Sequence, residues 1–64
     1  MIEIIKRNIR KEIRDRQKKT SDVCKMLGKS RNFINTLTDS SGIIKIQTIS
    51  KAIGCNISDL FKGL

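Results

Sequence analysis

The fold is decided by residues 23–37, which read VCKMLGKSRNFINTL. Two short helices that cross closely need a small residue at the crossing, a glycine at the sharp turn between them, and apolar residues that fix the second helix. Cys24 is small, Gly28 follows it four residues later, and apolar residues come six and nine positions after the glycine. The segment therefore predicts two short helices joined by a tight turn, the second over residues 30–38.

An amphipathic helix is predicted before this segment. The isoleucines at positions 2, 5, 9 and 13 follow one another at steps of three and four residues, so they share one face of a helix over residues 2–17. Lysines and arginines occupy most of the remaining circumference. A basic amphipathic helix can also lie on a membrane surface, but the helices that follow supply an apolar surface for the isoleucines to cover.

A loop and a further helix are predicted after the segment. Residues 39–42, DSSG, form the clearest loop in the chain, and Ser40 or Ser41 is suited to cap the next element. Residues 43–53 are rich in isoleucine, and their β-branched content would also fit a strand. The three- and four-residue spacing of these isoleucines favours a helix, which we expect to end at Gly54.

Polar residues mark the expected starts of the shorter helices. Residues 20–22, TSD, are suited to cap the second helix, and Ser30 is suited to cap the third. Asn56 or Ser58 is suited to cap a last turn or two that carries the final apolar residues. Together these patterns predict one all-α domain over residues 1–64, a compact bundle of four to five short helices.

Length and composition argue against an enzyme. A chain of 64 residues buries one small core and leaves little room for a catalytic cleft. It has no His, the commonest general base, and its two cysteines alone cannot complete a zinc site. We therefore expect no catalysis, metal, cofactor or small-molecule ligand, and two free thiols. With no run of about 20 apolar residues and no leader, the expected location is the cytoplasm.

The charge of the chain is strongly positive and unevenly placed. The formal net charge is +8 and the pI is about 10.1. Residues 1–31 hold eleven Lys or Arg against four Asp or Glu, whereas residues 32–64 hold three against two. A basic half suits a polyanionic partner, because neutralised phosphates release condensed counterions. A solvated, solubilising surface is the alternative interpretation.

The chain resembles the Cro and repressor-type helix-turn-helix family from about Ile5 to Phe61. The resemblance is carried first by the order small residue, glycine, apolar, apolar, which is found here in Cys24, Gly28, Ile34 and Leu37. It is carried also by residues 50–61, SKAIGCNISDLF, which have the A-x-G step, polar cap and closing apolar pair of the family's last two helices. The resemblance implies a lambda-repressor-like fold and binding to double-stranded DNA.

The resemblance also implies which residues read base edges. They are the exposed early residues of the third helix: Arg31, Asn32, Asn35 and Thr36. Their chemistry suits that role, because Arg pairs with guanine O6 and N7, Asn pairs with adenine N6 and N7, and a Thr methyl touches thymine. The alternative is a set of solvated polar residues on a surface helix, and Arg31 is nearly as well suited to a phosphate as to a base.

Candidate phosphate contacts lie near the expected helix starts. N–H groups and positive side chains at such places hold phosphates. The candidates are Lys19, Thr20, Lys29, Ser30 and Lys45. Simple helix capping is the alternative role for Thr20 and Ser30, and both roles can coexist.

A homodimer on DNA is expected by analogy with similar proteins, which gain affinity from two half-sites about one helical turn apart. The expected interface uses the end of the chain: Ile57, Leu60, Phe61 and Leu64. The favoured function is sequence-specific regulation of transcription, and the expected kind of regulator is a repressor. A protein-interaction module of the same fold is the alternative, which exposed isoleucines such as Ile4 or Ile44 would favour. A basic peptide that folds only on anionic lipid is a third class.

Overall fold

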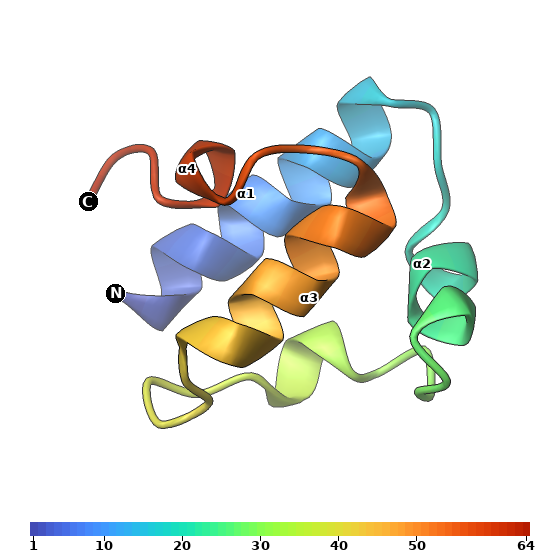
Figure 1. Cartoon of the computed structure of the whole chain (residues 1–64), viewed down its shortest axis with the longest axis horizontal. Coiled ribbons are helices and arrows are strands. Elements are labelled where there is room, and N and C mark those ends of the chain that lie inside the picture. Colours follow the sequence, from blue (N-terminus) through green and yellow to red (C-terminus); the bar gives the residue numbers. More distant parts are fainter.

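The computed structural model describes residues 1–64 and contains only helices (Figure 1). The elements in chain order are α1 (Ile2–Asp15), α2 (Thr20–Met26), the short 3₁₀ helix η1 (Ile34–Thr36), α3 (Ile43–Ile53) and α4 (Ile57–Leu60). The prediction of an all-α bundle with four to five short helices is confirmed.

The two long helices form the centre of the molecule. In Figure 1 α1 and α3 lie side by side, α2 packs against α3 at one end, and α4 packs against both long helices at the other. η1 lies along the edge of α3 opposite to α4, and both chain termini lie at the α4 end. The segment that the sequence marked as decisive, residues 23–37, therefore forms one edge of the bundle.

A single apolar cluster holds the elements together. Every helix contributes at least one side chain to it, because the three- and four-residue spacing of the isoleucines turns one face of each long helix inward. The buried members are Ile5, Ile9, Ile13, Val23, Cys24, Ile34, Leu37, Ile46, Ile49, Ile53 and Leu60. Full burial of one such side chain contributes roughly 1.5 to 3 kcal/mol, so these residues supply most of the driving force for folding.

The first two helices end with the same hydrogen-bond pattern. At the end of α1 the N–H of Lys18 donates to the carbonyl of Ile13 at 2.9 Å, and Gln17 between them has a φ of 57°. At the end of α2 the N–H of Lys29 donates to the carbonyl of Cys24 at 2.9 Å, and the intervening Gly28 has a φ of 69°. This is the Schellman pattern, in which a left-handed residue ends the helix.

The third helix differs most from its prediction. In place of a helix over residues 30–38 the structure has a turn at residues 31–33 followed by the single 3₁₀ turn of η1. The N–H of Thr36 is shared between the carbonyls of Asn32 and Phe33, at 3.2 and 3.1 Å. Asn, Thr, Ile and Phe are weak helix formers, and they fill this stretch. The prediction of the position is right and that of a full α-helix is wrong.

Several predicted caps and one helix end are also corrected. α1 ends at Asp15, two residues earlier than predicted, and no side chain caps α2 or α3, whose N-caps are Lys19 and Gly42. The hydroxyl of Ser41 accepts a hydrogen bond from the N–H of Thr38 within the loop instead. At α4 the expectation is right: Asn56 is the N-cap, and its N–H donates to the Asp59 carboxylate at 3.3 Å.

Candidate nucleic-acid interface

Residues 31–36, called the recognition segment below, lie on the surface over the core. Ile34 and the adjacent Leu37 are buried and fix the segment from beneath. Arg31 and Asn32 are exposed, and their side chains form no hydrogen bond or ion pair within the chain. The segment is thus anchored by apolar side chains on one side and presents unpaired polar groups on the other. It can contact a groove of a nucleic acid without a change of fold.

Thr36 is exposed on the same segment. Its hydroxyl donates to the carbonyl of Phe33 at 2.6 Å, so the donor is satisfied locally. This bond uses the hydroxyl hydrogen and leaves the side chain with its methyl group and the acceptor lone pairs of its oxygen. A contact of the Thr36 methyl with an apolar group such as the methyl of thymine stays a prediction.

Asn35 is exposed but differs from its neighbours, because α1 holds it. The guanidinium of Arg10 donates a hydrogen bond from Nη2 to Asn35 Oδ1. The ammonium of Lys6 donates to the backbone carbonyl of Asn35 at 3.1 Å. All four predicted base-contacting residues thus share the recognition segment, but the side-chain oxygen of one of them is already engaged.

The turn before the recognition segment brings two predicted phosphate contacts together. The ammonium of Lys29 lies 5.7 Å from the centre of the Phe33 ring, a cation–π geometry. A cavity of about 190 Å³ lies beside this pair, and Lys45 from the start of α3 also lines it. The other lining residues are Leu27, Ile44 and Thr48. Lys29 and Lys45 therefore flank one partly apolar hollow next to the recognition segment.

The remaining phosphate candidates occupy separate places. Ser30 is exposed between Lys29 and the recognition segment, and its carbonyl accepts a hydrogen bond from the N–H of Phe33. Lys19 is the exposed N-cap of α2, and Thr20, half-buried, is the first residue of that helix. Neither lines the hollow beside Lys29.

Sequence reasoning missed the part that α1 plays at this surface. Lys6 and Arg10 looked like ordinary members of a solvated basic face, because they stand four residues apart on the polar side of the helix. Their bonds to Asn35 span 29 and 25 residues of sequence. No periodicity in a single sequence reports a contact of that separation.

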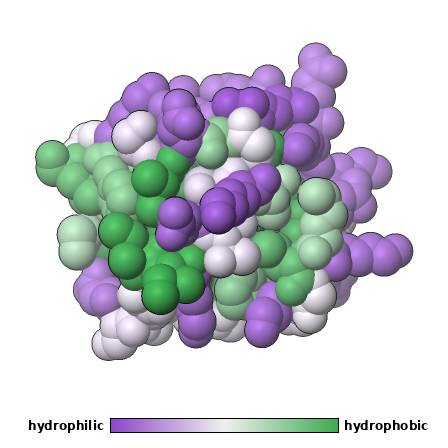
Figure 2. Space-filling model, viewed as in Figure 1, coloured by the Kyte–Doolittle hydropathy of each residue, from purple (hydrophilic) through white to green (hydrophobic).

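The predicted dimer surface is corrected in one residue. Leu60 is fully buried, with 0% of its surface exposed, so it is a core residue and cannot contact a partner. Its neighbours Ile57 and Phe61 are half-buried against the same core, and Leu64 is 57% exposed. Figure 2 shows apolar atoms gathered toward the end of the molecule where both termini lie, whereas hydrophilic atoms dominate its upper and right-hand edges.

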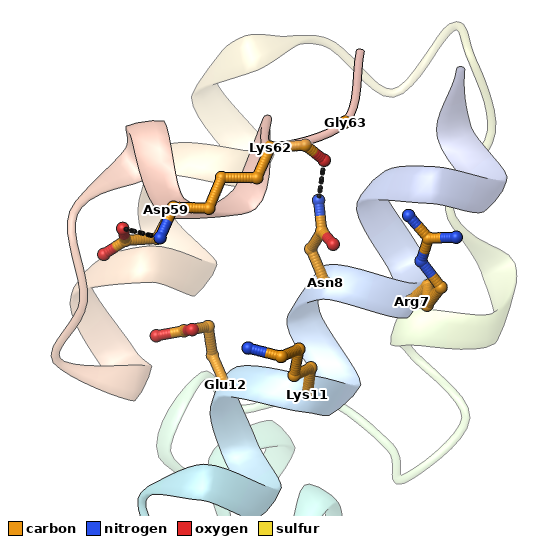
Figure 3. A pocket seen from close by; sticks show the side chains of 7 residues that line it. All are labelled: Arg7, Asn8, Lys11, Glu12, Asp59, Lys62 and Gly63. Carbon is orange, nitrogen blue, oxygen red and sulfur yellow. Dashed lines mark hydrogen bonds and ion pairs between the residues drawn. The ribbon is translucent and has the colours of Figure 1, made fainter.

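A second cavity, of about 360 Å³, lies between α1 and the C-terminal part of the chain that includes α4 (Figure 3). It is lined by Arg7, Asn8, Lys11, Glu12, Asp59, Lys62 and Gly63. Lys62 pairs with Asp59 at 3.3 Å, and Glu12 pairs with Arg16 at 3.5 Å. The charges of this cavity are therefore largely matched within the chain, unlike those of the recognition segment.

Cys55 lies close to this second cavity. Its thiol is within 4.8 Å of carboxylate oxygens of Glu12 and Asp59. Burial raises the pKa of the Cys55 thiol, the Glu12 carboxylate raises it further, and the Arg16 guanidinium lowers it by a smaller effect. The thiol therefore keeps its proton more strongly than an ordinary cysteine does. Cys24, the other cysteine, is buried in the core, and both thiols are free.

The comparisons with known proteins agree with this geometry. A family model described as a Cro/C1-type HTH DNA-binding domain matches residues 8–62, most of the chain. No curated protein and no solved structure matched the sequence. The structure also has no helix that is both long and apolar enough to cross a membrane. The match includes the turn at Gly28 and the recognition segment, and the chain therefore belongs to the Cro/C1-type helix-turn-helix family of DNA-binding domains.

Proposed function

We propose that this chain is a sequence-specific transcriptional regulator of the cytoplasm, a repressor, which places its recognition segment in the major groove of duplex DNA. The observation that carries the proposal is the exposure of Arg31, Asn32 and Thr36 on a segment fixed from beneath by Ile34 and Leu37. Each of the three exposed side chains has a base edge that it can contact.

Cations around the recognition segment would hold the phosphate backbone. Lys29 and Lys45 flank the hollow beside Phe33, and Lys19 stands at the start of α2. Thr20 and Ser30 add hydroxyl groups near the same helix starts. Phosphate contacts of this kind set the orientation on the duplex and supply most of the salt-dependent affinity.

Binding as a homodimer to two half-sites follows from the small size of the recognition segment, which spans only a few base pairs. The exposed Leu64 with the half-buried Ile57 and Phe61 offers an apolar surface for the second copy. With Leu60 in the core, this surface is smaller than the sequence alone predicted. Simultaneous binding of the two copies to adjacent half-sites of one operator would further stabilise the dimer.

The test is selection from a pool of random duplexes at about 150 mM salt, followed by sequencing. We expect a short motif, arranged as an inverted repeat if the protein binds as a dimer. A single unrepeated motif would support base reading and reject the dimer. Recovery of no motif, with binding that disappears as salt rises, would reject sequence-specific regulation.

One observation favours a second candidate function, docking on a partner protein. Ile44 is 75% exposed at the start of α3 and lines the hollow with Leu27 and Phe33. A partner held there by apolar contacts would bind with little dependence on salt, whereas phosphate binding weakens steeply. An Ile44→Ser variant that keeps its DNA affinity but loses a salt-resistant protein partner would support this candidate.

A further inference from the structure

We propose that Arg10 is a positioning residue that sets the base preference of Asn35, making it a donor to acceptor-only base edges and not a reader of adenine. The proposal rests on the proposed function, since it concerns how the recognition segment reads DNA. It assigns to α1, which lies outside the helix-turn-helix unit, a part in choosing the base.

The orientation of the Asn35 amide follows from its partner. Arginine carries five N–H donors and no acceptor, so the atom that it contacts must be the amide oxygen. The bond from Arg10 Nη2 to Asn35 Oδ1 thus directs the amide nitrogen, with its two hydrogens, away from the guanidinium. That nitrogen makes no hydrogen bond within the chain, and Asn35 is exposed.

The backbone of Asn35 is held from the same side. Lys6 donates to the Asn35 carbonyl at 3.1 Å, and only 12% of the Lys6 side chain is exposed; its ammonium also lies 3.7 Å from the Glu3 carboxylate. Between Lys6 and Arg10, Ile9 is fully buried in the core, so α1 is a fixed platform here. η1 is a single turn, whose buried Ile34 and adjacent Leu37 fix it from beneath, and the two bonds from α1 restrain the exposed Asn35 in addition.

The restraint changes what Asn35 can recognise. Pairing with adenine requires an amide oxygen to accept from N6 while the amide nitrogen donates to N7. Arg10 already takes one lone pair of Oδ1, so the N6 donor of adenine would have to share this oxygen with the charged guanidinium. The two free N–H groups of Asn35 instead match the O6 and N7 acceptors of guanine or the O4 acceptor of thymine. The remaining N–H groups of Arg10 lie beside the same position and also favour an acceptor.

The experiment compares Arg10→Ala, Arg10→Lys and the control Arg14→Ala on the operator obtained from random duplexes. Arg14 is exposed on the same helix and forms no ion pair or hydrogen bond through its side chain, so the control removes the same charge. We expect the wild type and Arg14→Ala to prefer guanine or thymine over adenine at one position, and Arg10→Ala to lose about tenfold of that preference. Arg10→Lys should restore it, because lysine also only donates.

Two further measurements make the result decisive. In an Asn35→Ala background, Arg10→Ala should leave the base preference unchanged. In the free protein, the side-chain amide resonances of Asn35 should shift in Arg10→Ala and stay in place in Arg14→Ala. Equal losses of affinity in Arg10→Ala and Arg14→Ala, with unchanged base preference, would overturn the proposal, as would unshifted resonances. If the wild type selects no motif, the proposed function itself fails, and the resonances still decide whether Arg10 holds Asn35.

Discussion

Asn8 in α1 donates a hydrogen bond from Nδ2 to the carbonyl oxygen of Leu60 at 2.9 Å, and so joins the first helix to the last. The same nitrogen donates to the carbonyl of Lys62 at 2.7 Å (Figure 3). Asn8 is buried, Leu60 is the last residue of α4 and Lys62 lies two residues beyond it, so no helical N–H is available to either carbonyl. A polar residue on the inner face of an amphipathic helix thus serves as a cap for another helix.

The first prediction follows from this contact. Asn8→Ala should lower the free energy of unfolding by roughly 1 to 3 kcal/mol, because it leaves two carbonyls with no donor. Urea unfolding followed by circular dichroism measures the change. Asn32→Ala is the matched control on an exposed asparagine and should change stability by less than about 0.5 kcal/mol. Equal effects of the two substitutions would show that the cap is not stabilising.

The second prediction concerns the left-handed residue after α1. Gln17 has a φ of 57°, a conformation that glycine adopts without steric cost. Gln17→Gly should therefore raise the free energy of unfolding by about 0.5 to 1 kcal/mol. Arg14→Gly, at an exposed position inside α1 whose side chain forms no hydrogen bond or ion pair, should lower that free energy by a similar amount. A change of the same sign in the free energy of unfolding of both variants would contradict the argument from backbone conformation.

The third prediction separates core from interface at the end of the chain. Leu60→Ala should cost roughly 2 to 5 kcal/mol of stability, because its side chain is fully buried. Leu64→Ala should leave the unfolding free energy within about 0.5 kcal/mol of the wild type. On operator DNA, sedimentation should show that Leu64→Ala weakens pairing of two copies. An unaltered dimer in that variant would place the interface elsewhere.

The fourth prediction uses the raised pKa of Cys55. Its thiol should react with iodoacetamide more slowly than a free cysteine at about pH 8, where an ordinary thiol is partly ionised. Glu12→Gln should speed the reaction, because it removes a negative charge that raises this pKa. Asp15→Asn, on the same helix, is the control and should leave the rate unchanged. Peptide mass spectrometry measures the rate, and no reaction is expected at Cys24.

The raised pKa of Cys55 also fixes the sign of one pH effect. The folded state holds the thiol proton more strongly than the unfolded state does, so this group stabilises the fold below the ordinary thiol pKa of about 8.5. That contribution is lost as the pH rises through the raised pKa of the folded protein. Replacing Cys55 by Ser should therefore flatten the fall in stability on the alkaline side, which unfolding curves at several pH values would show.

The parts of the fold that sequence could predict are those set by local chemistry. The isoleucine spacing predicts α1 and α3, and the glycines at 28 and 54 predict the ends of α2 and α3, because periodicity and left-handed caps are properties of neighbouring residues. The predicted end of α1 is two residues too late because Gln17 adopts the left-handed conformation that usually marks a glycine, and its residue type gives no sign of this. The predicted third helix, residues 30–38, is longer than η1 because burial in the core, and not helix propensity, holds this stretch in place.

The parts of the candidate site that sequence could not predict depend on contacts between distant elements. The residues of the recognition segment were found from their position after the turn. That Arg10 occupies the oxygen of Asn35 depends on how α1 crosses the segment, and that Leu60 points inward depends on the angle of α4. Such angles are set by packing of the whole bundle.

The central claim is that the recognition segment reads bases, and one measurement tests it most directly. The affinities of the wild type, Asn32→Ala and Arg31→Ala are measured by titration on the selected operator and on a scrambled duplex of equal length. We predict that the ratio of the two affinities falls by roughly 5- to 150-fold in the variants, as expected for loss of a bidentate base contact. Lys19→Ala should weaken both duplexes equally. An unchanged ratio in both recognition-segment variants would contradict the account.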